Sequence, residues 1–259
     1  MNLKIYASRT FLFILHLQKI NFFVDSKALE IKKNLFKEIA PDKKKLIFSF
    51  SKLLSQSNQL IETLDLGKGS TITYVRKRKV SEIAKNSSVS KKIGKIIHNL
   101  SKFNRAKNIL EIGTSLGMST VYLSTADMSS KVITLEGCEN TSNIALNNFN
   151  RFNLDNINLI KGNFSYTLDE ALEKTDSFDI IFFDGNHSKK DTIDYFYKCL
   201  KKINQKSIFI FDDINWSIEM NSAWDQIVKN DLVTLSFTFL RVGVLFFNKD
   251  LKNKNYNFL

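Results

Sequence analysis

Two acidic residues mark the ends of neighbouring strand-like runs, with a glycine-containing loop between them. Glu111 lies near the end of the apolar run 108–112, and Glu136 follows the run 131–135, 25 residues further on. An α/β protein brings bare backbone up to a small ligand at the carboxyl end of its first strand. An acidic side chain after the next strand can accept hydrogen bonds from both ribose hydroxyls. The spacing therefore predicts a nucleoside pocket.

The loop after Glu111 argues against a dinucleotide. Pyrophosphate binding favours Gly-x-Gly-x-x-Gly, because the phosphates must sit on a helix N-terminus. Here two glycines stand four residues apart with a serine between them, so no phosphate needs to be held. We expect the ligand to be bound by loop and helix-start residues, namely Gly113, Thr114, Ser115, Gly117 and Ser119.

Three further carboxylates follow two other apolar runs. Asp184 ends the run 178–183, and Asp212 and Asp213 end the run 207–211. Neighbouring strands would bring the three into one crevice, where unpaired carboxylates repel one another and are costly to desolvate. A divalent cation such as Mg²⁺ would relieve that cost. The alternative is that Asp212 or Asp213 caps the next helix or faces the ligand pocket directly.

A histidine near these carboxylates is a candidate general base. His187 lies three residues after Asp184, and its ordinary pKa is close to neutral. Ser188 and Asp191 form a capping signature for the next helix, which would hold His187 at the mouth of the crevice. A surface loop histidine is the plainer interpretation. Trp216 could wall the site of a second substrate.

The elements that must position these residues alternate from residue 108 onward. Regular β-α alternation predicts a parallel sheet covered on both faces. The last two strand-like runs, 232–240 and 242–247, have only a short connection and must pair antiparallel. We therefore predict a doubly wound, seven-stranded, mostly parallel sheet whose last strand is antiparallel. The other predicted strands are 108–112, 131–135, 157–160, 178–183 and 207–211, with helices at 117–126, 140–151, 166–174, 190–203 and 217–229.

The N-terminal part follows a different pattern. Apolar residues at helical spacing predict helices over 26–39 and 43–64, with a turn or linker at 64–70 and one or two more helices within 81–100. We expect a basic helical extension over residues 1–79 and a catalytic domain over 80–259. The extension's amphipathic helices would permit a homodimer.

Charge is divided unevenly along the chain. Residues 1–107 hold 23 Lys and Arg against 7 Asp and Glu, whereas residues 108–259 hold 15 against 19. A basic segment can bind RNA, anionic lipid or an acidic partner, but no aromatic-interleaved RNA motif is present. The chain has two cysteines, at no metal or redox spacing, and the apolar run 11–15 is too short to span a bilayer. These features predict a cytoplasmic protein without a membrane span.

The order of the motifs resembles class I S-adenosylmethionine-dependent methyltransferases. Over residues 80–247 the chain is similar to their small-molecule O-methyltransferase branch, which contains catechol and caffeoyl-CoA O-methyltransferases. Five segments in the right order, each at a strand end, carry the resemblance, and residues 1–79 are not covered by it. The segments are 110–117, 135–138, 162–164, 182–187 and 210–213.

The resemblance implies S-adenosylmethionine as cofactor and assigns roles to its contacts. Glu111 would accept from the cofactor's amino group, and Glu136, with Gly137 beside it, would take the ribose hydroxyls. Asn163 stands where the family contacts the adenine ring, although a turn former is an equal alternative. Asp184 would also border the cofactor.

The resemblance bears on the three aspartates and the histidine as well. In catechol O-methyltransferase the positions matching Asp184, Asp212 and Asp213 are metal ligands, of types Asp, Asp and Asn. The third position departs from that pattern, because an aspartate stands here in place of the asparagine and adds a negative charge. His187 stands where the metal-dependent relatives carry a catalytic lysine.

These observations predict methyl transfer from S-adenosylmethionine to a hydroxyl of a small molecule, with His187 as base and Asp184 beside it. One alternative is an RNA methyltransferase that docks through the basic N-terminus. It lacks the Asn-Pro-Pro-Tyr type segment of amino-group methylation after the fourth strand. The other alternative is a cofactor-binding protein that has lost catalysis and acts as a partner in an assembly.

Overall fold

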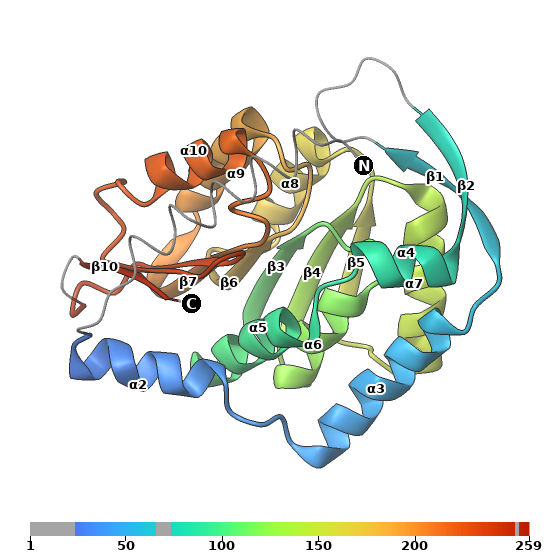
Figure 1. Ribbon diagram of the computed structural model, residues 1–259, viewed down its shortest axis with the longest axis horizontal. Coiled ribbons are helices and arrows are strands. Elements are labelled where there is room, and N and C mark those ends of the chain that lie inside the picture. The colour runs from blue at the N-terminus through green and yellow to red at the C-terminus, as the bar shows by residue number, and fades with distance from the viewer. Residues whose placement is uncertain (1–23, 66–73, 252–253, 259) are drawn as a thin grey trace.

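A computed structural model of the protein describes residues 24–65, 74–251 and 254–258. In this described part of the chain, the central sheet has eight strands in the order β10-β8-β9-β7-β6-β3-β4-β5 (Figure 1). The strands are β3 (Asn108–Ile112), β4 (Lys131–Glu136), β5 (Ile157–Lys161), β6 (Phe178–Phe183), β7 (Ile203–Phe211), β8 (Leu235–Thr238), β9 (Gly243–Phe246) and β10 (Lys254–Asn257).

Pairing within the sheet follows the predicted topology. β3 pairs in parallel with both β4 and β6, and β6 pairs in parallel with β7. β9 is antiparallel to both β7 and β8, so the predicted antiparallel last strand of the seven is confirmed. The parallel strands β3, β4, β6 and β7 all end at one side of the sheet, which we call the carboxyl edge.

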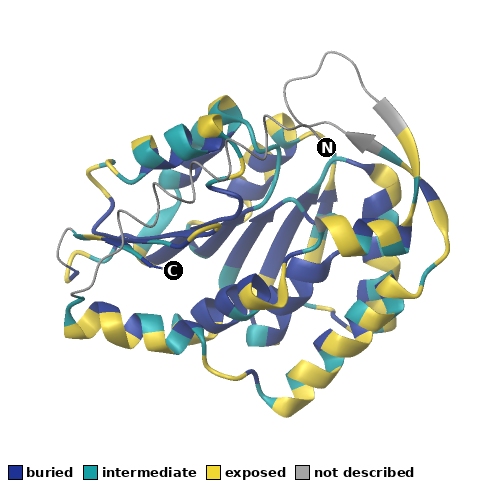
Figure 2. Cartoon of the chain, in the orientation of Figure 1, coloured by how far each residue is buried: buried dark blue, intermediate teal, exposed yellow. Residues whose placement is uncertain are grey.

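Helices cover both faces of the sheet, and Figure 2 shows the strands buried between helices whose outer sides are exposed. Apolar residues alternate between the faces along β3, β4, β5, β6, β7 and β9, so that these strands contribute to two cores. One face carries α2 (Ser26–Leu35), α3 (Pro41–Ser55), α4 (Val80–Ser87), α5 (Lys91–Phe103), α6 (Met118–Ala126) and α7 (Glu139–Arg151). The other carries α8 (Phe164–Glu173), α9 (Lys189–Leu200) and α10 (Ile218–Ile227).

The N-terminal part departs from the sequence prediction. The helix expected over 43–64 ends at Ser55, and β1 (Leu60–Asp65) pairs antiparallel with β2 (Tyr74–Lys79). The apolar residues of 60–64 fit a helix or a strand, and antiparallel pairing with β2 decides for the strand. Most of the 64–70 turn lies outside the described residues, as does the apolar run 11–15.

The two parts of the predicted domain division share one core. Ile31, Phe50 and Ile61 lie in the same apolar cluster as Ile109 of β3 and Phe237 of β8. The described residues 24–65 therefore belong to the core on this face of the sheet, where α2 packs on α5, α3 packs on α6 and β1 packs on α7. The boundary between residues 79 and 80 stays a prediction.

The eighth strand, β10, was not predicted, because its sequence Lys-Asn-Tyr-Asn has no apolar run. It pairs in parallel with β8 at the edge of the sheet. Its Tyr256 hydroxyl donates to the carboxylate of Asp25, the N-cap of α2, at 2.7 Å, and Lys254 forms an ion pair with the same carboxylate at 3.2 Å. The C-terminal strand thus fixes the start of the first described helix.

Candidate active site at the carboxyl edge

Glu111 is the most deeply buried acid of the site. Its side chain lies between β4 and α6, where Oε2 accepts from the Thr120 hydroxyl at 2.5 Å and the Thr134 hydroxyl at 2.6 Å. Burial raises the pKa of Glu111 to about 7, although the hydroxyls of Ser119, Thr120 and Thr134 oppose the shift. Its other oxygen, Oε1, has no hydrogen-bond partner among the residues that the structure describes. A buried acceptor left in this state fits a ligand that brings an N–H donor.

The glycine loop is shaped by backbone that other residues adopt poorly. Gly113 has φ +108°, and a Cβ there would lie 2.4 Å from the Asp184 carbonyl oxygen, so the loop passes directly over the end of β6. Gly117 has φ +87° at the N-cap of α6, where a Cβ would meet the ring of Phe149. Both glycines predicted from the spacing are therefore required by the fold.

Glu136 holds this loop in place. Its Oε2 accepts from the Ser115 backbone N–H at 2.7 Å, and its Oε1 accepts from the Cys138 backbone N–H at 2.8 Å. Burial raises the pKa of Glu136, and the backbone donors, which include Gly137, oppose the shift. Each carboxylate oxygen accepts a second hydrogen bond readily, so ribose hydroxyls can still be taken up.

The remaining predicted cofactor residues lie around these two acids. The hydroxyls of Thr114 and Thr134 are 2.5 Å apart, which joins the loop to Glu111 through Thr134. Asn163 is exposed and is the N-cap of α8, with Oδ1 accepting from the Ser165 backbone N–H at 2.9 Å. This capping role matches the interpretation of Asn163 as a turn former. Its contact with an adenine ring stays a prediction.

The three aspartates meet as predicted, but an arginine meets them too. Arg241, in the turn between β8 and β9, donates through Nε and Nη2 to the two oxygens of Asp212, each at 3.1 Å. The same Nε lies 2.7 Å from Oδ1 of Asp213. Burial raises the pKa of Asp212 to about 6, with Asp213 adding to the shift and Arg241 opposing it. Burial and the two neighbouring aspartates hold the pKa of Asp184 well above its usual range.

The metal ion expected at Asp184, Asp212 and Asp213 does not fit this arrangement. A guanidinium already occupies the carboxylate oxygens that a divalent cation would need, in the planar two-point geometry that arginine favours. In the described ranges no group of three His, Cys, Asp or Glu side chains is placed to hold a metal ion. The extra charge of Asp213, where catechol O-methyltransferase has Asn, is here compensated by an arginine.

His187 lies beside the cluster. Its Nε2 is 3.9 Å from Oδ1 of Asp184 and 4.0 Å from Oδ2 of Asp213, and its side chain is partly exposed. Burial lowers the pKa of His187, with Arg241 lowering it further and Asp213 opposing. The imidazole is therefore neutral at pH 7 and can accept a proton. Ser188 caps α9 as predicted, and the Trp216 ring centre lies 6.5 Å from that of His187.

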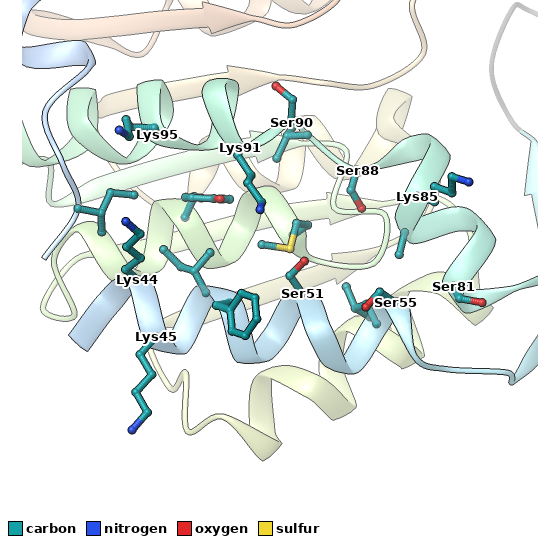
Figure 3. A pocket seen from close by; sticks show the side chains of 18 of the residues that line it. Lys44, Lys45, Ser51, Ser55, Ser81, Lys85, Ser88, Ser90, Lys91 and Lys95 are labelled. Atoms are coloured by element: carbon teal, nitrogen blue, oxygen red, sulfur yellow. The ribbon is translucent and has the colours of Figure 1, made fainter. Parts of the chain in front are cut away.

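A large groove opens next to this edge. It has a volume of about 1300 Å³ and lies between α3 on one side and α4 and α5 on the other (Figure 3). Met118, the residue after Gly117, lines it, and so does Arg241. We call this space the α3–α5 groove. It places open volume beside both the glycine loop and the carboxylate–arginine cluster.

Sequence reasoning missed Arg241, Thr120 and Thr134. Arg241 is a lone charge between two apolar strands, and that isolation was the one available signal. Thr134 faces Glu111 only through the β3–β4 register, in which the two residues are direct partners. Trp224 is buried and donates to the Thr238 hydroxyl at 3.0 Å.

No helix in the described parts of the chain has the length and apolar character needed to span a bilayer. Cys138 and Cys199 are buried and are not joined in a disulfide.

Comparisons with known proteins agree with the geometry. A catechol O-methyltransferase of Niastella koreensis is 30% identical over 130 residues, which cover 49% of this chain and 58% of that protein. The alignment thus spans little more than half of the relative's length. An O-methyltransferase of Bacillus cereus, crystallised with SAH, has 25% identity and a TM-score of 0.54, over 62% of this chain and 83% of that one.

A methyltransferase of Podospora anserina, also SAH-bound, shares the fold, with a TM-score of 0.60 and 16% identity over 89% of this chain and 99% of that one. The model of the family described as O-methyltransferase matches residues 62–256. Because residues 62–256 make up well over half of this chain, the chain belongs to the O-methyltransferase family.

Proposed function

We propose that the protein binds S-adenosylmethionine and transfers its methyl group to a hydroxyl oxygen of a small molecule. One observation carries the proposal: the unpartnered, fully buried Glu111 Oε1 at an edge that also gathers Asp184, Asp212 and Asp213. That edge holds more carboxylates than cations. The SAH bound in the Bacillus cereus relative supports a ligand of this chemical class.

The cofactor fits the residues present at the edge. Its amino group would donate to Glu111 Oε1, and its ribose hydroxyls would donate to Glu136, whose backbone contacts already fix its orientation. When bound, S-adenosylmethionine supplies an electrophilic methyl group on a positively charged sulfur. Carboxylates nearby favour binding of that charge.

His187 is the proposed general base. Its neutral imidazole would take the proton of the acceptor hydroxyl as the oxygen becomes a nucleophile. Asp184 and Asp213, at 3.9 and 4.0 Å from Nε2, would then stabilise the imidazolium. Arg241 contributes fixed positive charge at the same place, and no step needs a divalent cation.

Titration calorimetry with S-adenosylhomocysteine tests the cofactor assignment. We expect one site per chain, and a Glu136→Gln variant that binds more weakly because it loses one charged acceptor for the ribose. A folded sample that shows no heat of binding would refute the proposal.

Nothing in the comparisons supports the RNA-directed or the catalytically silent alternative. A cytoplasmic location is consistent with two buried cysteines that form no disulfide. A homodimer stays a prediction.

A further inference from the structure

Two consecutive residues in the loop that carries His187 have left-handed backbone. Asn186 has φ +69° and His187 has φ +36°. The His187 backbone N–H donates to the Gly185 carbonyl oxygen at 3.0 Å, so Asn186 is the central residue of a three-residue turn. A γ-turn whose central residue has positive φ is a rare and strained form. Such conformations persist only where the surrounding structure fixes them.

Tight packing is found at the start of this loop. Gly185 lies against the end of β3, where a Cβ would come 3.1 Å from the Ile112 carbonyl oxygen and 2.6 Å from the ring of Phe164. The next three residues, 186–188, are partly exposed. Polar contacts therefore have to hold them.

One carboxylate binds the side chains on both sides of His187. Oδ2 of Asp191, in the first turn of α9, accepts from Nδ2 of Asn186 at 2.7 Å and from Oγ of Ser188 at 2.5 Å. The Asp191 backbone N–H donates in return to Ser188 Oγ at 3.1 Å. Capping of α9 requires only the contacts with Ser188. The bond to Asn186 is additional, and it holds the strained residue.

The helix that carries this carboxylate is itself fixed. Tyr195, one turn further along α9, is buried, and its ring centre lies 6.3 Å from that of Phe164 in an edge-on contact. Nδ2 of Asn186 also lies 3.5 Å from the Tyr195 hydroxyl. Asp191 thus ties the loop to a helix whose position the core determines.

The residue held in this way is the one beside the aspartates. Nε2 of His187 lies 3.9 Å from Oδ1 of Asp184 and 4.0 Å from Oδ2 of Asp213. Both distances are too long for a hydrogen bond. The aspartates alone therefore do not fix the imidazole, and the backbone of the loop has to do so.

From these contacts we infer that Asp191 is a positioning residue for His187: its carboxylate holds Asn186 and Ser188, and the loop between them keeps the imidazole beside Asp184 and Asp213. The inference rests on the proposed function, in which His187 is the general base. Asp191 acts through the loop backbone.

The rate at which His187 reacts with diethyl pyrocarbonate measures this positioning without a known acceptor. The reagent modifies neutral imidazole, and peptide mass spectrometry resolves the chain's three histidines. The His187 side chain is 31% exposed, so release of the loop can expose it further. At pH 8, Asp191→Ala should raise the rate at His187 at least about tenfold, the scale on which hydrogen bonds to a charged group shift an equilibrium.

Two further variants sharpen the test. Asp191→Asn should react close to the wild-type rate, because both donors converge on one oxygen and an amide still supplies it. Asn186→Asp tolerates positive φ but sets a second carboxylate against Asp191 in place of the amide donor, so it should raise the rate at His187 as Asp191→Ala does.

Two controls separate positioning from a general loss of stability. Asp194→Ala changes an exposed carboxylate of the same helix, and Asp25→Ala removes the N-cap of α2, on the other face of the sheet. Both should react at His187 at the wild-type rate, even if Asp25→Ala lowers the melting temperature as much as Asp191→Ala does.

An unchanged His187 rate in Asp191→Ala or in Asn186→Asp would overturn the inference, and so would an equal increase in Asp25→Ala or in Asp191→Asn. If Asp191→Ala does not fold, Asn186→Asp decides alone. S-adenosylhomocysteine should bind these variants and the wild type with equal affinity. A wild type that does not bind it would refute the proposed function, whereas the rates would still decide whether Asp191 positions His187.

Discussion

Replacing Glu111 by glutamine should change how stability depends on pH. The folded state holds the pKa of Glu111 near 7, against 4.5 for the free side chain, because the carboxyl group is fully buried. A folded pKa above the unfolded one means that ionisation destabilises the fold. The resulting loss of unfolding free energy is absent well below pH 4.5, grows between pH 4.5 and 7, and is constant above pH 7.

The magnitude follows from the shift. At 1.36 kcal/mol per pKa unit, the wild type should lose about 2.5 kcal/mol of unfolding free energy between pH 5 and pH 8 through this one group. Glu111→Gln removes that loss. The amide leaves one donor poorly satisfied, which costs about 1–3 kcal/mol at every pH, so the comparison between the two pH values cancels it.

Urea unfolding at pH 5 and pH 8, followed by tryptophan fluorescence, measures the difference. The exposed Glu173 supplies a control variant, Glu173→Gln, whose pH profile should match the wild type. Profiles of wild type and Glu111→Gln that run parallel would show that Glu111 does not carry a buried charge and would refute the reasoning.

The same group should report on cofactor binding. At pH 6 Glu111 is mostly protonated, and an incoming ammonium group favours the carboxylate, so S-adenosylhomocysteine should displace about one proton per site. Calorimetry in two buffers of different ionisation enthalpy counts that proton. Glu111→Gln should release none and bind more weakly.

Two further predictions concern the carboxylate cluster. Arg241→Ala should create a cation site, because it frees the oxygens of Asp212 and Asp213; Mn²⁺ binding, followed by electron paramagnetic resonance, should be at least about tenfold tighter than in the wild type. A wild type that binds Mn²⁺ equally well would contradict this view of Arg241. His187→Gln should lower kcat about 10²- to 10⁴-fold with unchanged affinity for S-adenosylhomocysteine, and the wild-type rate should persist to a lower pH than an ordinary histidine base allows. Turnover that survives the substitution would remove His187 from the mechanism.

The sequence alone predicts the site residues that lie at the ends of strands. Glu111 and Asp184 meet because β3 and β6 pair in parallel and because Gly113 lets the loop pass over Asp184. Periodicity and topology rules carry that much information without knowledge of side-chain packing.

Such rules do not predict contacts that form only when distant parts of the chain pack together. Arg241 reaches Asp212 from a different turn, 29 residues away, and no local pattern records that approach. β10 forms because β8 offers an open edge, so its polar sequence gave no sign of a strand. The segment of β1 carries Leu60, Ile61 and Leu64 at a spacing that fits a helix, and only pairing with β2 makes it a strand.

The bond between Asp25 and Tyr256 has a consequence for synthesis of the protein. α2 leaves the ribosome early, yet the hydroxyl that secures its N-cap belongs to a residue translated 231 positions later. Cotranslational docking of α2 therefore stays incomplete until the last strand emerges. A nascent chain stalled before β10 would carry the glycine loop and the carboxylates but would lack the hydroxyl that secures the start of α2.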